Sequence, residues 1–146
     1  MVYSASSLET IVPELQRLLY VDDDSDMLRV AEIALLMSGP LDVLSCNSGE
    51  SAIAKVAAFN PQLVMLDLNM PGMNGKQTLR GLQNTHDMSH VAVVFITAAN
   101  DANELQELRA LGAFDIIEKP FDPMTLGRRT QTIWEAWQIA TSNPSD

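Results

Sequence analysis

The feature that most limits the fold is a regular alternation of short strand-like runs with amphipathic stretches. The strand-like runs lie at 18–21, 42–46, 63–66, 91–96 and about 113–117. Several are apolar on both sides of the pleat, which is typical of parallel strands covered by helices on both faces. We therefore predict an α/β fold in which a five-stranded parallel sheet is flanked by five helices.

Helix start and stop signals separate these runs. The expected helices cover about 26–37, 47–59, 76–83, 101–111 and 122–139. Their ends are marked by Gly39-Pro40, by Asn47 three residues before Glu50, by Asp101 three residues before Glu104, by Gly112, and by Asp122 followed by Pro123. Capping side chains, a proline in the first turn and a glycine after the last turn are the usual helix boundaries.

The alternation uses nearly the whole chain, so we expect one domain at 18–141. Residues 1–17 are expected to form an N-terminal extension with a short helix, because Ile11, Leu15 and Leu18 have helical spacing. Residues 142–146 are expected to be a tail. A chain of 146 residues is one domain's worth, and we expect no second domain.

The charge balance limits the partners. The chain has nineteen Asp and Glu but only nine Lys and Arg, which gives a formal net charge of -10. Phosphate backbones and anionic membrane surfaces repel such a chain, so direct nucleic-acid binding is not expected, whereas a cation or a basic partner suits it. No apolar run approaches the roughly 20 residues that span a bilayer, so membrane insertion is not expected. Cys46 is the single cysteine, and we expect a cytoplasmic protein.

Chemically active side chains follow the predicted strands. The first strand delivers Asp22 and Asp23, the third Asp67, the fourth Thr97 and the fifth Lys119. In open α/β sheets, ligands bind outside the carboxyl ends of the strands. Each residue taken alone is more often a cap, a turn or a strand former, but their joint occurrence at these ends indicates a site.

A cluster of carboxylates needs compensation, because neighbouring carboxylates repel one another and favour protonation. A divalent cation such as Mg2+, which prefers oxygen ligands, and the ammonium of Lys119 are the two available compensations. Acids, a cation, a hydroxyl and a lysine together suit a phosphoryl group, with one carboxylate as the nucleophile.

These motifs closely resemble the receiver domain of two-component response regulators, in particular the stand-alone chemotaxis type. The resemblance covers about 18–139 and rests on four segments: Leu19 to Asp24, Met65 to Gly75, Phe95 to Ala98 and Glu118 to Phe121. It implies the flavodoxin-like strand order 2-1-3-4-5. It also implies that the peptide between Lys119 and Pro120 is cis.

The resemblance implies a role for each site residue. Asp67 would be the phosphoacceptor, and it would hold Mg2+, with Mn2+ as a substitute, together with Asp22, Asp23 and the backbone carbonyl of Asn69; Thr97 would hydrogen-bond the phosphoryl group, and Lys119 would pair with it. The donor would be a sensor histidine kinase or a histidine phosphotransfer domain. The chain would catalyse its own phosphorylation and dephosphorylation without being a multiple-turnover enzyme, and would signal to an unknown downstream protein or pass the phosphoryl group onward.

One position departs from the family pattern and keeps alternatives open. The family usually has an aromatic residue or His three residues before the motif lysine, and this chain has Ile116, so a ring flip cannot report activation. The domain could be a relay, an output switch, or an interaction module of receiver fold that takes no phosphate. A phosphatase of the aspartyl-nucleophile type is disfavoured, because Asn69 replaces the Asp that would act as its general acid.

Two apolar groups have both a packing and a binding interpretation. The first predicted helix carries Met27, Leu28, Val30, Ile33, Leu35, Leu36 and Met37, which we expect to be mostly core, with any surplus forming a donor-docking patch. Trp134 and Trp137 near the chain's end are expected to be core, with a partner surface as the alternative.

Overall fold

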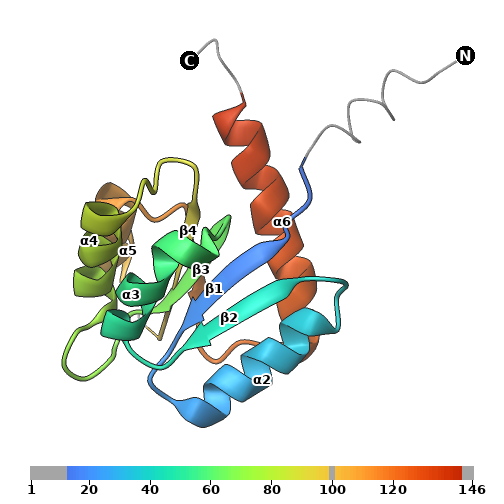
Figure 1. The fold of residues 1–146 in the computed structure, drawn as a ribbon, viewed down its shortest axis with the longest axis horizontal. Helices are drawn as coiled ribbons and strands as arrows, with labels where there is room; N and C mark the ends of the chain where they lie inside the picture. The colour runs from blue at the N-terminus through green and yellow to red at the C-terminus, as the bar shows by residue number, and fades with distance from the viewer. Residues whose placement is uncertain (1–12, 99–100, 143–146) are drawn as a thin grey trace, which may run out of the picture.

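A computed structural model describes residues 13–98 and 101–142. Its centre is a parallel sheet in the order β2-β1-β3-β4-β5, as the resemblance implied (Figure 1). The strands are β1 (Arg17–Val21), β2 (Asp42–Cys46), β3 (Leu63–Asp67), β4 (Ala92–Thr97) and β5 (Asp115–Glu118). The predicted flavodoxin-like α/β fold is confirmed.

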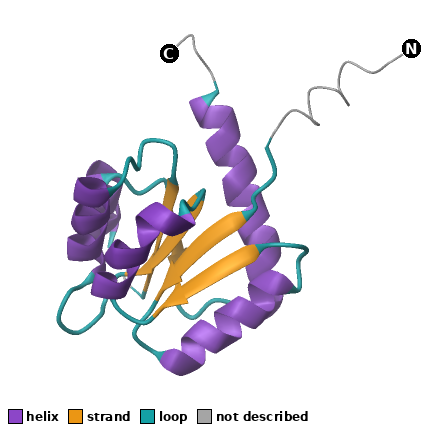
Figure 2. Ribbon diagram, viewed as in Figure 1, coloured by secondary structure: helices purple, strands orange, loops and turns teal. Residues whose placement is uncertain are grey.

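Five helices cover the two faces of this sheet (Figure 2). The helices are α2 (Ser25–Leu36), α3 (Gly49–Phe59), α4 (Gly75–Thr85), α5 (Ala102–Leu111) and α6 (Pro123–Thr141). α3, α4 and α5 lie on one face, and α2 and α6 lie on the other (Figure 1).

The alternation of side chains along each strand divides the core between the two faces. On β1, Leu19 and Val21 pack toward α3 and α4, whereas Leu18 and Tyr20 pack toward α2 and α6. On β4, Phe95 and Ile96 divide in the same way. Strands buried on both faces explain why the apolar runs show no alternation in the sequence.

Most helix boundaries follow the predicted signals, with two corrections. Asp101 and Asp122 cap their helices as N-cap residues and Gly112 ends α5, as predicted, and Asp24 is the N-cap of α2. The N-cap of α3, however, is Ser48 and not Asn47, because the Ser48 hydroxyl accepts a hydrogen bond from the Ser51 N–H. α4 is longer than predicted at both ends, and it begins with a capping box that sequence reasoning missed.

That capping box joins Asn74 and Gln77. The Asn74 side chain accepts from the Gln77 N–H, and the Gln77 side chain accepts from the Asn74 N–H, both at 2.9 Å. This reciprocal pair satisfies amide groups that the helix itself leaves unbonded. It fixes the start of α4 directly after the loop that leaves β3.

The expected N-terminal helix receives no support from the described residues. Residues 13–16 are not helical, and the rest of the proposed helix lies outside the described residues. The Gln62 side chain accepts the Gln16 N–H at 2.6 Å and the Arg17 N–H at 2.9 Å, which holds the entry to β1 extended. The predicted tail begins one residue after α6 ends, and 143–146 lie outside the described residues.

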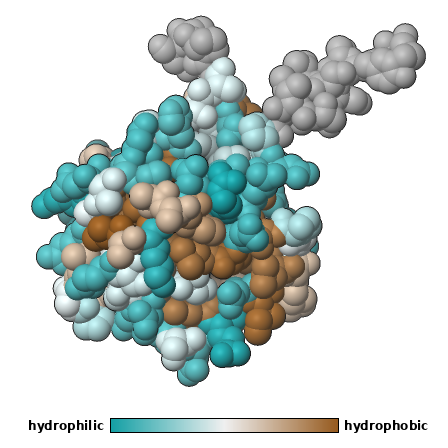
Figure 3. All heavy atoms as spheres, in the orientation of Figure 1, coloured by the Kyte–Doolittle hydropathy of each residue, from teal (hydrophilic) through white to brown (hydrophobic). Residues whose placement is uncertain are grey.

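The expectation that the apolar residues of α2 are mostly core is wrong. Ala31, Ala34 and Leu35 are buried, but four large apolar side chains of α2 and its C-cap are exposed: Val30, Ile33, Leu36 and Met37. In Figure 3 hydrophobic side chains gather at the lower right, where Figure 1 places the C-terminal half of α2. Trp134 is buried and Trp137 is half-buried against Phe114, so both serve the core.

Among the described residues, no helix has the length and hydropathy needed to cross a bilayer.

The first prediction concerns the close approach of α4 to the end of β3. A Cβ on Gly75 would lie 2.6 Å from the Asp67 carbonyl oxygen and 2.8 Å from the Leu68 Cα. Because these are backbone atoms, Gly75→Ala should destabilise the fold by about 2 kcal/mol, measured by urea unfolding. Gly81→Ala, in the same helix, is the matched control: its Cβ meets only the flexible end of Ile53, so it should cost much less. Equal effects would contradict the assignment.

Candidate functional site

Three carboxylates meet at the carboxyl ends of β1 and β3. One oxygen from each of Asp22, Asp23 and Asp67 lies within 4.8 Å of the others. Asp22 and Asp67 are almost completely buried, at 1% and 2% exposure, while Asp23 is exposed. The cluster is therefore a buried pair of acids with a third acid at the solvent side.

Strand register brings these acids together. β1 and β3 pair directly, with Tyr20 opposite Met65 and Val21 opposite Leu66, so Asp22 and Asp67 are the next residues along. Asp22 follows Tyr20 by two residues and Asp67 follows Met65 by two, which places both carboxylates on the face that α2 and α6 cover. The structure thus brings these two acids together at the ends of neighbouring strands.

Lys119 reaches the cluster from the loop that follows the edge strand β5. Its Nζ lies 2.9 Å from Asp67 Oδ1, an ion pair in which the carboxylate is buried and the ammonium is partly exposed. The Lys119 backbone N–H donates to the Thr97 carbonyl at 2.8 Å, which ties the loop after β5 to the end of β4. The peptide between Lys119 and Pro120 is cis, as the resemblance implied.

Burial and like charge shape the ionisation of the site. Burial, with a smaller contribution from the charge of Asp67, raises the pKa of Asp22 from 3.8 to about 6, although the Asp24 N–H and Lys119 oppose the change. Burial lowers the pKa of the Lys119 ammonium, but its hydrogen bond to Asp67 and the surrounding carboxylates outweigh that effect, so the pKa lies above its usual value. The lysine therefore stays charged beside Asp67.

The donor set suits a hard divalent cation. Asp22 Oδ1 accepts the Asp24 N–H at 3.0 Å, but Asp22 Oδ2 is buried and makes no hydrogen bond among the described residues. Opposite ligands of Mg2+ lie about 4 Å apart, since each ligand sits at about 2.1 Å from the ion. The 4.8 Å spread of the three carboxylates requires only a small contraction or one intervening water.

The remaining predicted residues lie around this cluster. Thr97 is buried at the end of β4, and Asn69 is exposed in the loop after β3. Ile116 is half-buried on β5, where its N–H donates to Asp115 Oδ1 at 2.7 Å and its carbonyl accepts from Arg129 at 3.0 Å. Ile116 packs on the α3–α5 side of the sheet, opposite the face that carries Asp22 and Asp67.

Sequence reasoning missed the polar groups beneath the acids. The Tyr20 hydroxyl and Ser45 Oγ are buried on the α2–α6 side of the sheet and make no hydrogen bond among the described residues. Both lie in strand-like runs, where the sequence gives no sign that a hydroxyl faces a neighbouring acid.

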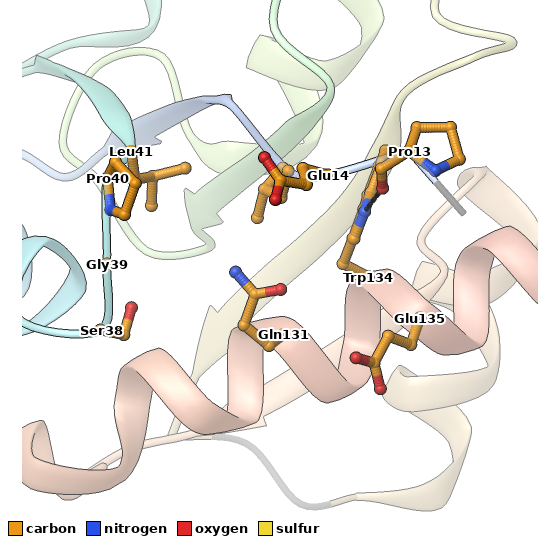
Figure 4. Close-up of a pocket in the computed structure, with 10 residues that line it drawn as sticks. Pro13, Glu14, Ser38, Gly39, Pro40, Leu41, Gln131, Trp134 and Glu135 are labelled. Atoms are coloured by element: carbon orange, nitrogen blue, oxygen red, sulfur yellow. Dashed lines mark hydrogen bonds between the residues drawn. The ribbon is translucent and has the colours of Figure 1, made fainter. Parts of the chain in front are cut away.

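A separate cavity of about 290 Å³ lies at the opposite end of the sheet (Figure 4). It lies between the entry to β1, the Ser38–Leu41 loop and α6, where the Trp134 indole N–H donates to the Pro13 carbonyl at 2.8 Å. Its lining carries the carboxylates of Glu14 and Glu135 but no nucleophile paired with a base. The strand ends therefore remain the better candidate for chemistry.

Comparison with known families decides the assignment. Residues 18–131 match the family described as the response regulator receiver domain. The chain belongs to this family. Receiver domains are generally phosphorylation switches rather than enzymes, and the triad of Asp22, Asp23 and Asp67 is typical of the receiver Mg2+ site.

Individual relatives agree with this assignment. The receiver is 37% identical over 116 residues to the DNA-binding response regulator MtrA of Mycolicibacterium paratuberculosis, a match that covers 80% of this chain and 50% of that protein. It is 35% identical over 102 residues to the DNA-binding transcriptional regulator NtrC of Salmonella typhimurium, covering 70% of this chain and 21% of that protein. The chain thus spans about half the length of MtrA and about a fifth of the length of NtrC.

Two solved structures are matched over nearly their whole length. The chemotaxis response regulator CheY4 of Vibrio cholerae has a TM-score of 0.75 at 25% identity, and the match covers 82% of this receiver and 99% of that chain. A CheY-like receiver domain from Methanospirillum hungatei has a TM-score of 0.74 at 22% identity, covering 88% and 100%, and shows the fold alone.

The second prediction concerns the stability of the metal-free receiver. Because the pKa of Asp22 is near 3.8 when unfolded and about 6 when folded, the folded state binds more protons between these values. The contribution of Asp22 to the free energy of unfolding therefore falls as pH rises from about 4 to about 6, and stays low above. In EDTA, Asp22→Asn should therefore change the free energy of unfolding more favourably near pH 7 than near pH 4. The difference between the two changes should be about 2 kcal/mol.

Asp23→Asn is the control, because that carboxylate is exposed and should change stability by about 0.5 kcal/mol or less at either pH. Denaturant unfolding at the two pH values measures both variants. A gain from Asp22→Asn that is the same at both pH values would show that burial of its charge is not the cause.

Proposed function

We propose that Asp67 of this receiver domain accepts a phosphoryl group from a phosphohistidine in a Mg2+-dependent reaction. The observation that carries the proposal is the 2.9 Å ion pair between Lys119 and the buried Asp67 carboxylate, beside two further acids. A nucleophilic carboxylate, a fixed cation and a set of metal-binding oxygens are the parts that phosphoryl transfer requires.

In the proposed reaction, a carboxylate oxygen of Asp67 attacks the phosphorus of the phosphohistidine in line. The bond from phosphorus to the imidazole nitrogen breaks, and the imidazole leaves with the electron pair. The product is an acyl phosphate on Asp67, which water later hydrolyses to restore the carboxylate. This is self-directed chemistry on one residue, and not multiple turnover of outside substrates.

The residues around Asp67 would have different roles in the reaction. Asp22, Asp23, Asp67 and the Asn69 carbonyl would hold Mg2+, or Mn2+ in its place, and the bound ion would neutralise the charge of the transferring group. Lys119 supplies a fixed positive charge that carboxylates hold in its protonated form. The Thr97 hydroxyl would hydrogen-bond the phosphoryl oxygens once the acyl phosphate forms.

The donor would be a sensor histidine kinase or a histidine phosphotransfer domain. We assign its docking surface to the exposed apolar side chains of α2 and its C-cap together with Met124 at the start of α6, which we call the α2 patch: Val30, Ile33, Leu36, Met37 and Met124, between 40% and 74% exposed. A groove of about 410 Å³ between α2 and α6 includes Met37 and Met124. Contiguous exposed apolar side chains of this kind mark interaction sites.

The output would be a protein–protein contact or onward phosphotransfer. Ile116 replaces the usual aromatic switch residue, so any activation signal would pass through backbone and helix movement. The net charge of -10 opposes direct nucleic-acid binding by this chain, whatever its DNA-binding relatives do. We place this function in the cytoplasm, where receivers typically act.

An interaction module that takes no phosphate is the second candidate, and Ile116 is the observation that favours it. Under that alternative the fold and the α2 patch would serve binding alone. The two candidates differ in whether Asp67 is ever modified.

The third prediction tests that difference. With Mg2+ and radiolabelled acetyl phosphate, the wild-type receiver should incorporate label, and EDTA should abolish incorporation because the acids need a cation. Asp67→Asn removes the nucleophile and should reduce labelling at least about 100-fold. Asp42→Asn, at an exposed carboxylate on the amino end of β2, is the control and should label like the wild type. Unlabelled wild type, or equal labelling of Asp67→Asn, would favour the interaction module.

The fourth prediction tests the α2 patch. Ile33→Glu places a charge in the patch, so transfer from a phosphorylated histidine kinase should slow about tenfold or more, because the apolar contact is lost. Labelling by acetyl phosphate should stay unchanged, since that small donor needs no docking. Ile139→Glu, at a side chain 70% exposed near the end of α6, is the matched control. If both variants slow kinase transfer equally, the patch is not the docking surface.

A further inference from the structure

Three buried polar atoms near the acid cluster have no hydrogen bond among the described residues. They are the Tyr20 hydroxyl, Asp22 Oδ2 and Ser45 Oγ. A polar atom removed from water without a partner destabilises a fold, so such atoms are rare unless they have a role. Three of them in one region indicate a polar network beneath the metal site.

Strand geometry places the three on one side of the sheet. Tyr20 and Asp22 are two residues apart on β1, so their side chains leave the same face. Ser45 lies directly opposite Tyr20 on β2, and parallel partners in register share a face. Neighbours at this spacing remain within reach of an aromatic side chain. The face is the one that α2 and α6 cover, to which Asp67 also belongs.

The hydroxyl, and not the ring, is the part of Tyr20 that needs an explanation. Tyr20 is completely buried and among the largest side chains of the core. A phenylalanine would fill that space with the same ring and leave no polar atom unpaired. A tyrosine hydroxyl is protonated at neutral pH, so toward a carboxylate it acts as a hydrogen-bond donor.

Asp22 has one oxygen available for such a donor. Its Oδ1 already accepts the Asp24 N–H at 3.0 Å, whereas Oδ2 is buried without a partner. We propose that Tyr20 is a positioning residue of the metal site, whose hydroxyl, together with Ser45, holds the buried oxygen of Asp22 through one bridging water and so orients this carboxylate toward a divalent cation. The inference rests on the proposed function, because it assumes that Asp22 binds the ion.

Residues behind metal ligands have measurable effects on affinity. Removing a group that orients a ligand typically weakens metal binding 10- to 100-fold. If Tyr20 served packing alone, loss of its hydroxyl would affect Mg2+ affinity and metal-free stability together. Loss of the hydroxyl should weaken the cation site and should not weaken the metal-free fold.

The test is Tyr20→Phe, with Mg2+ affinity measured by calorimetry at a fixed pH and metal-free stability measured by urea unfolding in EDTA. We expect the dissociation constant for Mg2+ to rise about tenfold, while the urea midpoint stays the same or increases. Ser45→Ala should change the affinity in the same direction by a smaller factor. Unchanged affinity in Tyr20→Phe, or a loss of affinity matched by a loss of stability, would overturn the proposal.

Thr130→Val is the matched control, because it also removes a buried hydroxyl, whose partner is the Leu126 carbonyl on α6. Its affinity for Mg2+ should equal that of the wild type, and a tenfold loss there would overturn a specific role for Tyr20. If Tyr20→Phe fails to fold, Ser45→Ala decides alone, and unchanged affinity in that variant overturns the proposal. Wild type that binds no Mg2+ would refute the proposed function as well, whereas binding unaffected by Tyr20→Phe would refute the positioning role only.

Discussion

Burying carboxylates side by side costs free energy, and the rest of this site follows from how the chain offsets that cost. Asp22 and Asp67 lie almost out of contact with water, and the pKa of Asp22 rises to about 6 as a result. Lys119 compensates one of the two charges through its 2.9 Å contact with Asp67. The other charge is left for a cation, which makes ion binding part of the stability of the folded domain.

The sheet brings these groups together at the carboxyl ends of its strands. Neighbouring strands β1 and β3 end at the same level, so residues 45 positions apart in the chain meet without any loop having to place them. The capping box at Asn74 and the close approach of Gly75 hold the loop after β3 against Asp67. α2, the helix that carries the α2 patch, begins directly after Asp22, Asp23 and its N-cap Asp24.

Sequence could predict what depends on local pattern. Strand order and residues with few alternative uses indicate the parallel sheet, the caps at Asp101 and Asp122, and the meeting of Asp22, Asp67 and Lys119. Ser48 as a cap, the exposure of Ile33 and Leu36, and the buried Tyr20 hydroxyl could not be predicted. Adjacent residues compete for a cap, an apolar helix does not reveal which face is covered, and a tyrosine in a strand looks the same whether or not its hydroxyl has a partner.

The central claim is that Asp67, Lys119 and the acid triad form a cation-dependent phosphoacceptor. The most direct measurement is a crystal structure of the wild-type chain with Mg2+ and beryllofluoride, which mimics an acyl phosphate. The account predicts beryllium bonded to an Asp67 oxygen, Mg2+ held by Asp23, Asp67 and the Asn69 carbonyl with Asp22 in contact, and both Lys119 and Thr97 bonded to fluorine atoms. Beryllofluoride absent from Asp67, or an ion bound away from the triad, would contradict it.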